Sequence, residues 1–157
     1  MRYLNAIIPT LRSTIIKLNK LQNYSTTIQL NDIMYTKSHE YIDKEEGKSI
    51  AKVGISQYAS KNVGAIIYAE TIDEDNVVEK GSVIGILETV KAANDIYSPI
   101  TGIIVEKNNK VIEEPEIIIN DPLGDGWILK ISCNKIDDKD LMSSEEYEKY
   151  VDKIRDN

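Results

Sequence analysis

The stretch SVIGILETVKAANDIYSPITG, residues 82–102, contains two strand-like segments with a short break between them. SVIGILE is typical of one β-strand, and DIYSPITG of the beginning of the next. Val90 to Ala93 then form the tip of a hairpin. The pattern therefore predicts that Lys91 is presented at a turn, between small or apolar neighbours.

A two-copy internal repeat surrounds this hairpin. NVVEKGSVI at 76–84 aligns with KVIEEPEII at 110–118, and a second echo stands upstream of each copy, GAIIYAE at 64–70 and GIIVEK at 102–107. Two copies are too few for a solenoid. They predict two similar β halves packed on one another, because each half alone would leave an apolar face uncovered.

The composition of the 157-residue chain favours strands and one domain with appendages. Apolar residues make up 41% of the chain and aromatic residues 6%, with no Phe, so the core must be built from Ile, Val, Leu and a few Tyr. Because β-branched residues favour strands, we expect a mainly β fold.

The C-terminal segment at about 143–154 has the pattern of a capped amphipathic helix. Ser143 and Glu146 make a capping box. Four apolar residues recur on one face at helical spacing: Tyr147, Tyr150, Val151 and Ile154. We expect this face to close one side of the β core, with the binding of a partner protein as the alternative.

Residues 1–31 differ from the rest of the chain in charge. They contain four basic residues and no Asp or Glu, and their apolar residues share one face of a helix. This composition predicts a mitochondrial transit peptide and a matrix location, which leaves 32–157 as the domain. A disordered tail or a helix of the fold is the alternative, and no apolar run approaches the length of a membrane span.

The charged and reactive residues exclude several classes of function. Fifteen basic against 26 acidic residues give 32–157 a net charge of −11, so nucleic acid is not expected as a partner. Cys133 is the only cysteine, and His39, the only histidine, is expected to be a hydrogen-bonded structural residue. Phosphate-binding loops and nucleophile motifs are absent, so the sequence supports neither autonomous catalysis nor a metal site.

Lys91 has the surroundings of an acylation site. Acylation of its amine makes a neutral amide, and the four-carbon stem then becomes a tether for a mobile cargo. Such a site needs a rigid turn, small neighbours and no salt bridge that holds the amine. Val90, Ala92 and Ala93 meet the last two requirements. A solvated surface lysine without a special task is the alternative.

The motif GILETVKAANDIYSPITG resembles the lipoyl-attachment motif of the H-protein of the glycine cleavage system. Further stretches resemble that family in the same order, between about Met34 and Val151: YTKSHEYI, VGISQYA, VGAIIYAE, KGSVIG, EEPEIIINDPLGDGWILKI and EEYEKYV. The resemblance implies a lipoyl-domain-like sandwich or flattened barrel of two quasi-symmetric antiparallel sheets with a C-terminal amphipathic helix.

The resemblance also implies a carrier and not an enzyme. Lys91 would hold lipoate through an amide, attached by a lipoate ligase or lipoyltransferase. The arm would take an aminomethyl group from glycine decarboxylase (P-protein) to aminomethyltransferase (T-protein), and dihydrolipoamide dehydrogenase (L-protein) would reoxidise it. Ser38, Glu40 and Asp95 match the positions that hold the charged end of the loaded arm in a cleft, where carboxylates and a hydroxyl can bind an ammonium group.

Four positions depart from the family pattern. The family commonly has Trp where this chain has Tyr41, Ser at the positions of Thr89 and Asn94, and Tyr at that of Leu123. One alternative is a lipoyl carrier or donor for 2-oxoacid dehydrogenase systems, whose lipoyl domains usually have Asp where Val90 stands. The other is an unmodified scaffold with the same fold.

Overall fold

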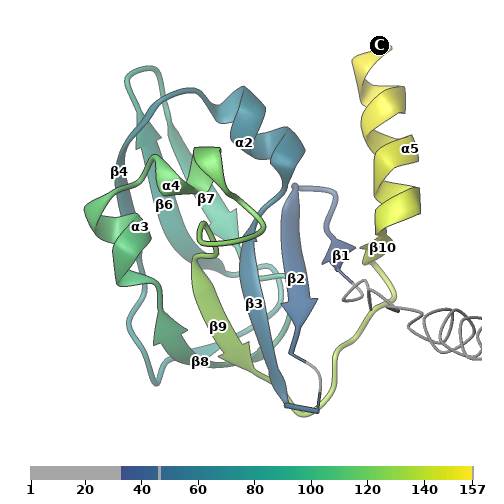
Figure 1. The fold of residues 1–157 in the computed structure, drawn as a ribbon. Helices are drawn as coiled ribbons and strands as arrows, with labels where there is room; N and C mark the ends of the chain where they lie inside the picture. Colours follow the sequence, from purple (N-terminus) through teal and green to yellow (C-terminus); the bar gives the residue numbers. More distant parts are fainter. Residues whose placement is uncertain (1–32, 46, 157) are drawn as a thin grey trace, which may run out of the picture. The chain divides into compact units, whose positions relative to one another are not determined.

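The structure, a computed structural model, describes residues 33–45 and 47–156 (Figure 1). The transit peptide predicted at 1–31 lies outside the described residues. Within them, ten strands form two antiparallel sheets, and helices α2 to α5 connect or follow the strands. The prediction of a mainly β fold is therefore confirmed.

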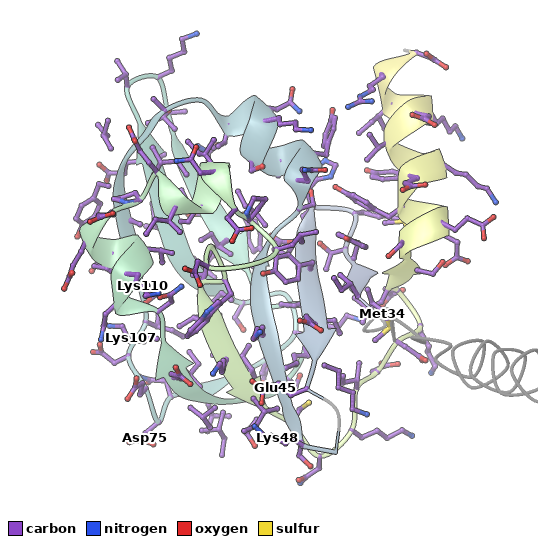
Figure 2. The ribbon with its side chains drawn as sticks, viewed as in Figure 1. Met34, Glu45, Lys48, Asp75, Lys107 and Lys110 are labelled. Atoms are coloured by element: carbon purple, nitrogen blue, oxygen red, sulfur yellow. The ribbon has the colours of Figure 1, made fainter. Side chains whose placement is uncertain are left out.

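The larger sheet has seven strands in the order β10-β1-β2-β3-β9-β8-β5. Their bounds are β1 Met34–Tyr35, β2 Glu40–Lys44, β3 Ile50–Ile55, β5 Val77–Val78, β8 Gly102–Lys107, β9 Leu129–Ser132 and β10 Met142–Ser143. At the turn between β2 and β3, Lys48 Nζ lies 2.7 Å from the carboxylate of Glu45 (Figure 2). The strands at both edges have only two residues, and the sheet stays open instead of closing into a barrel.

The smaller sheet has three strands in the order β4-β6-β7, with bounds β4 Ile66–Thr71, β6 Val83–Thr89 and β7 Ala93–Tyr97. Strands β6 and β7 form the predicted hairpin, with Glu88 opposite Ala93. Next to Gly85 the ladder shifts register, and a Cβ on this residue would lie 2.7 Å from the carbonyl oxygen of Glu70. Glycine therefore allows the close approach of β4 and β6.

One hydrophobic core lies between the two sheets. Its buried side chains come from β2, β3, β5, β8 and β9 of the larger sheet, from β4, β6 and β7 of the smaller, and from the short helices that follow β8. Most of them are aliphatic, as the absence of Phe requires; the fully buried ones include Ile42, Val53, Ile84, Ile104, Leu129 and Ile131. Complete burial of such a side chain contributes about 1.5–3 kcal/mol, so this shared core joins the sheets.

The internal repeat is only partly a repeat of structure. Both upstream echoes form strands, β4 and β8. The first copy of NVVEKGSVI then supplies β5 and the start of β6, whereas its counterpart at 110–118 lies in two short helices, α3 Asn109–Glu113 and α4 Ile117–Asn120. The side chain of Asn108 caps α3 by accepting a hydrogen bond from the Lys110 amide, and Pro115, without an amide hydrogen, separates the helices. The expectation of two similar β halves was therefore wrong for the second copy.

The predicted C-terminal helix is present as α5, Ser144–Arg155. Ser143 is its N-cap, and the capping box with Glu146 is formed. Tyr147 is buried against Tyr35 of β1, with the rings stacked at a centroid distance of 4.3 Å. The apolar face of α5 therefore packs on the domain, as expected, and does so at the β1 side of the larger sheet, where β10 leads into the helix.

Candidate functional site

The tip of the β6–β7 hairpin presents Lys91 to solvent. Strand β6 ends at Thr89 and β7 begins at Ala93, and the hairpin projects at the upper left of the view (Figure 1). Lys91 and Ala92 are exposed, and 82% of Val90 is accessible. No hydrogen bond or ion pair of the Lys91 ammonium group is found among the described residues. The tip therefore leaves the amine free to react.

Thr89 holds this turn through its hydroxyl group. Thr89 Oγ1 donates to the carbonyl oxygen of Ala92 at 3.0 Å and accepts from the amides of Lys91 and Ala92 at 3.2 and 3.1 Å. The Thr89 amide also donates to the Ala92 carbonyl at 2.8 Å. The hydroxyl thus uses its one donor and both acceptor sites. These hydrogen bonds restrain the turn and so meet the remaining requirement for an acylation site, a rigid turn. The Ser that the family usually has at this position carries the same hydroxyl.

A buried carboxylate, Glu40, lies at the start of β2. Only 2% of Glu40 is accessible, and its Oε2 accepts hydrogen bonds from Ser38 Oγ at 2.6 Å and from Thr36 Oγ1. Its Oε1 accepts from the backbone amide of Tyr97 at 3.1 Å. Hydrogen bonds from hydroxyl and amide donors to a carboxylate offset the cost of burying its charge.

Asp95 is joined to this carboxylate through Tyr97. The phenol of Tyr97 donates to Asp95 Oδ2 at 3.3 Å, while its amide donates to Glu40. The negative charge of Asp95, followed by burial and the hydrogen bond itself, raises the pKa of Tyr97 above its usual 10.0. The phenol therefore remains a proton donor at physiological pH.

A groove of about 550 Å³ contains Glu40 and Ser38. Its lining residues are Thr36, Lys37, Ser38, Glu40, Lys80, Gly81, Tyr97, Ser98, Pro99 and Asp140. One wall carries the ion pair between Lys80 Nζ and Asp140 Oδ2, 3.2 Å apart. Of the three predicted cleft residues, Ser38 and Glu40 thus lie in the groove, and Asp95 lies beside it, hydrogen-bonded to the lining residue Tyr97.

Strand β7 connects the hairpin tip to the groove. The chain is extended from Ala93 to Tyr97, so the groove residue Tyr97 lies about 13 Å from Ala93 along the strand, and Lys91 lies beyond Ala93 in the turn. A bare lysine side chain spans only about 6 Å from Cα to Nζ, given its five single bonds. Lys91 alone therefore cannot reach the groove, whereas a long acyl chain extends its reach along β7.

Sequence reasoning missed two residues of the site, Thr36 and Tyr97. Tyr97 could have been found from strand periodicity, because Asp95 and Tyr97 stand two residues apart and must share a face of β7. Thr36 gave a weaker signal: a Thr and a Ser closely precede Glu40, and such hydroxyls often bind neighbouring groups in a turn. The bond between Glu40 and Tyr97 had no local signal, since the residues are far apart in sequence.

His39, which precedes Glu40 in the chain, is a hydrogen-bonded structural residue. Its backbone is left-handed, with φ of 79°, and its Nδ1 is hydrogen-bonded to the Tyr147 hydroxyl at 2.7 Å. That hydroxyl is also hydrogen-bonded to Ser56 Oγ at 2.6 Å. Burial lowers the pKa of His39 below 6.5, against a smaller opposite effect of Glu40. The prediction of a hydrogen-bonded histidine is confirmed.

The departures from the family pattern fit the structure. Tyr41 is fully buried, and its hydroxyl donates to the carbonyl oxygen of Pro122 at 2.9 Å. A Cβ on Gly54 would lie 2.7 Å from the Tyr41 ring, so the glycine leaves room for it. Asn94 Nδ2 donates to the Leu87 carbonyl oxygen at 3.4 Å, across the β6–β7 pair.

No group of three or more His, Cys, Asp and Glu residues among the described residues could hold a metal ion. No helix within 33–45 and 47–156 is long and apolar enough to cross a membrane.

Comparison with known proteins shows which family this chain belongs to. The family described as glycine cleavage H-protein matches residues 33–154. The glycine cleavage system H protein of Prochlorococcus marinus (strain MIT 9312) is 39% identical over 122 residues, which cover 77% of this chain and 93% of that protein. The probable glycine cleavage system H protein 1 of Saccharolobus solfataricus is 41% identical over 129 residues, 82% of this chain and 92% of that protein.

A solved structure agrees with the sequence relatives. The crystal structure of a glycine cleavage system H protein from Mycobacterium marinum superposes with a TM-score of 0.69 at 26% sequence identity, and the match covers 80% of this chain and 98% of that one. The family match, the relatives and the shared sandwich together lead to one conclusion. This chain belongs to the glycine cleavage H-protein family, whose members are lipoyl carriers.

Proposed function

We propose that Lys91 is the lipoyl-attachment residue and that this protein carries the aminomethyl group of the glycine cleavage system. On this proposal it is a non-catalytic subunit. It takes the group from glycine decarboxylase to aminomethyltransferase, and dihydrolipoamide dehydrogenase reoxidises it. A lipoate ligase or lipoyltransferase attaches the lipoate. The observation that carries the proposal is the exposure of Lys91, which has no ion pair with any described residue, at a turn held by the Thr89 hydroxyl.

The residues of the tip fit an amide-linked arm. Modification converts the ammonium group of Lys91 into a neutral amide, so an ion pair at this position would have to be broken first, and none is found among the described residues. Val90 and Ala92 have short side chains and lie exposed on either side, which leaves room for a modifying enzyme. The oxidised lipoyl group supplies a disulfide: as its S–S bond breaks and takes up two electrons, one sulfur accepts the aminomethyl group and the other becomes a thiol.

The groove fits the charged end of a loaded arm. An amine near neutral pH carries a proton, and nearby carboxylates favour that charged form. Glu40 and Ser38 line the groove, and Asp95 borders it, so two carboxylates and a hydroxyl are available to an ammonium group. A protonated amine has no free lone pair with which to expel the sulfur, so these residues would slow hydrolytic loss of the group.

Intact-mass analysis tests the attachment. Protein produced with an active lipoate ligase and lipoate should gain one lipoyl group, and the Lys91→Arg variant should gain none. Lys61, an exposed lysine in α2, provides a matched control: Lys61→Arg should be modified as fully as the parent. A parent protein without an adduct would refute the assignment and favour an unmodified scaffold. An adduct that survives in Lys91→Arg would refute the assignment by placing the attachment at another residue.

We also propose that residues 1–31 direct the protein to the mitochondrial matrix, because they are basic, free of acidic residues and amphipathic when helical. A reporter fused behind these residues should be imported into mitochondria. Replacing Arg2, Arg12, Lys17 and Lys20 with Gln should abolish import. A reporter that stays in the cytosol in both forms contradicts the proposal, without affecting the assignment of Lys91.

A further inference from the structure

Tyr97 bridges the two sheets at the groove. Its amide donates to Glu40 Oε1 at 3.1 Å. Tyr97 ends β7 of the smaller sheet, and Glu40 begins β2 of the larger. The two residues are 57 positions apart in the chain, so this contact exists only because the sheets pack on one another.

The side chain of Tyr97 serves the same site. Its phenol donates to Asp95 Oδ2 at 3.3 Å, and the residue lines the groove with 38% of its surface exposed. Asp95 itself is exposed on β7, where a carboxylate without a partner samples several rotamers. The hydrogen bond engages Oδ2 and leaves Oδ1 as an acceptor for a ligand.

We propose that Tyr97 is a positioning residue for the ammonium group at the end of the loaded arm: its amide orients Glu40, its phenol orients Asp95, and its ring forms a wall of the binding site. This inference rests on the proposed function of Lys91. It adds a residue that acts through the two carboxylates and assigns each part of Tyr97 a role.

Two physical effects follow from this arrangement. Carboxylates held in place bind an ammonium group better than mobile ones, because their conformational entropy is already lost on folding and not on binding. An aromatic ring beside the cation adds a cation–π attraction. The raised pKa of the Tyr97 phenol keeps it a donor to Asp95 over the physiological range.

The chain contains a matched control pair on the same sheet. Tyr68 of β4 donates to Glu70 Oε2 at 3.2 Å, again two residues apart on an exposed strand. The charge of Glu70 raises the pKa of Tyr68 in the same direction. Neither residue lines the groove. Tyr68→Phe therefore removes an equivalent hydrogen bond away from the proposed site.

The first test measures how fast the loaded arm loses its aminomethyl group in the absence of the other proteins. Water hydrolyses the aminomethyl thioether to the free thiol, formaldehyde and ammonium. Formaldehyde and ammonium are assayed. Tyr97→Phe should speed the loss about fivefold, the effect of one ordinary hydrogen bond. Tyr97→Leu, without ring or phenol, should speed it further. Tyr68→Phe should match the parent protein.

A double variant tests whether Tyr97 acts through Asp95. Asp95→Asn should also speed the loss, and adding Tyr97→Phe to it should have no further effect, because the phenol acts on the ammonium group by orienting the Asp95 carboxylate, which the first change has removed. Additive effects, or a parent rate in Tyr97→Phe, would overturn the positioning role. If the fully lipoylated parent loses the group as fast as Glu40→Gln, the groove does not hold the loaded arm. If Lys91 carries no lipoyl group, the proposed function is refuted, whatever the role of Tyr97.

The second test uses the unmodified protein and needs no arm. NMR titration of tyrosine labelled at Cζ should show the pKa of Tyr97 falling towards 10.0 in Asp95→Asn and staying raised in Glu70→Gln. Glu40→Gln should shift the Tyr97 amide proton resonance in the unmodified protein, and Glu70→Gln should not. An unchanged Tyr97 pKa in Asp95→Asn, or an unchanged amide resonance in Glu40→Gln, would show that the bridge is not formed.

Discussion

At the scale of single residues, Thr89 decides how Lys91 is presented. The hydroxyl forms three hydrogen bonds within the tip, two of them with amides that the turn would otherwise leave to water. A side chain that closes a turn on its own backbone is typical of Ser and Thr. The lysine owes its rigid base to this hydroxyl, since Val90 and Lys91 themselves are exposed.

Thr89→Val removes the hydroxyl and keeps the shape of the side chain. We expect lipoyl attachment at Lys91 to slow about fivefold in kcat/KM, because a looser turn presents the amine in more conformations. Thr89→Ser keeps the hydroxyl and should remain within about twofold of the parent. Equal rates for the Val and Ser variants would show that the hydroxyl does not matter for presentation.

Glu40 and Asp95 should share the task of holding the charged end of the arm. Glu40→Gln with Asp95→Asn removes both negative charges near the groove, and we expect hydrolytic loss of the aminomethyl group to rise at least tenfold, since charge-assisted hydrogen bonds are the stronger kind. Glu70→Gln provides the control, because Glu70 lies outside the groove. If Glu70→Gln speeds the release as much as the double variant does, the release depends on the overall negative charge of the protein and not on a specific site.

At the scale of elements, α5 is attached to the domain through a polar cluster as well as through apolar packing. Tyr147 stacks on Tyr35, and its hydroxyl joins His39 of the β1–β2 connection to Ser56, the N-cap of α2, Gln57–Val63. Burial raises the pKa of Tyr147 to about 12, so the phenol stays protonated. One side chain of α5 thus connects three parts of the fold.

The partly buried His39 makes stability depend on pH in a defined direction. Its pKa is lower in the folded protein than the 6.5 of the unfolded chain. Between these two pKa values the unfolded chain binds more protons, so the free energy of unfolding falls as the pH drops below about 6.5 and levels off below the folded pKa. His39→Asn removes this contribution, and Asn tolerates the left-handed backbone.

Urea denaturation at several pH values measures this effect. The parent protein should lose more stability between pH 7 and the acid range than His39→Asn does, while the carboxylates titrate alike in both. Because the substitution also removes a hydrogen bond, the comparison concerns the slope with pH and not the absolute stability. Identical slopes would contradict a depressed pKa of His39.

At the scale of the whole molecule, the acidic surface governs encounters with partner proteins. Residues 32–157 carry a net charge of −11 before any modification, and amide formation at Lys91 removes one more positive charge. A surface of one sign steers partners with complementary patches and raises the rate of association. We expect the partners to present basic docking faces.

Salt dependence tests this expectation. The rate at which dihydrolipoamide dehydrogenase reoxidises the reduced protein should fall several-fold in kcat/KM between about 0.02 and 0.2 M NaCl, as screening shortens the reach of the charges. Free dihydrolipoamide, which is not attached to an acidic protein, should be oxidised at a rate that depends little on salt. A salt effect of the same size on both substrates would exclude steering by this surface.

Local pattern and family resemblance predict much of this protein from its sequence. The hairpin at 82–102 and the capped helix near the C-terminus follow from short-range rules, because strand alternation, turn residues and caps act over a few positions. The dense resemblance to H-proteins predicted the sandwich. It also predicted Ser38 and Glu40 as cleft residues; both line the groove, while their role toward the arm and Lys91 as the lipoyl site remain predictions.

The tertiary structure decided what depends on distant parts of the chain. The second repeat copy became α3 and α4, because Asn108 and Pro115 impose local geometry that a similarity of apolar positions does not show. The link from Glu40 to Tyr97 joins two sheets, and the packing of their shared apolar core determines which residues meet. Sequence therefore determined the elements and the candidate lysine, while sheet packing decided which side chains can hold its charge.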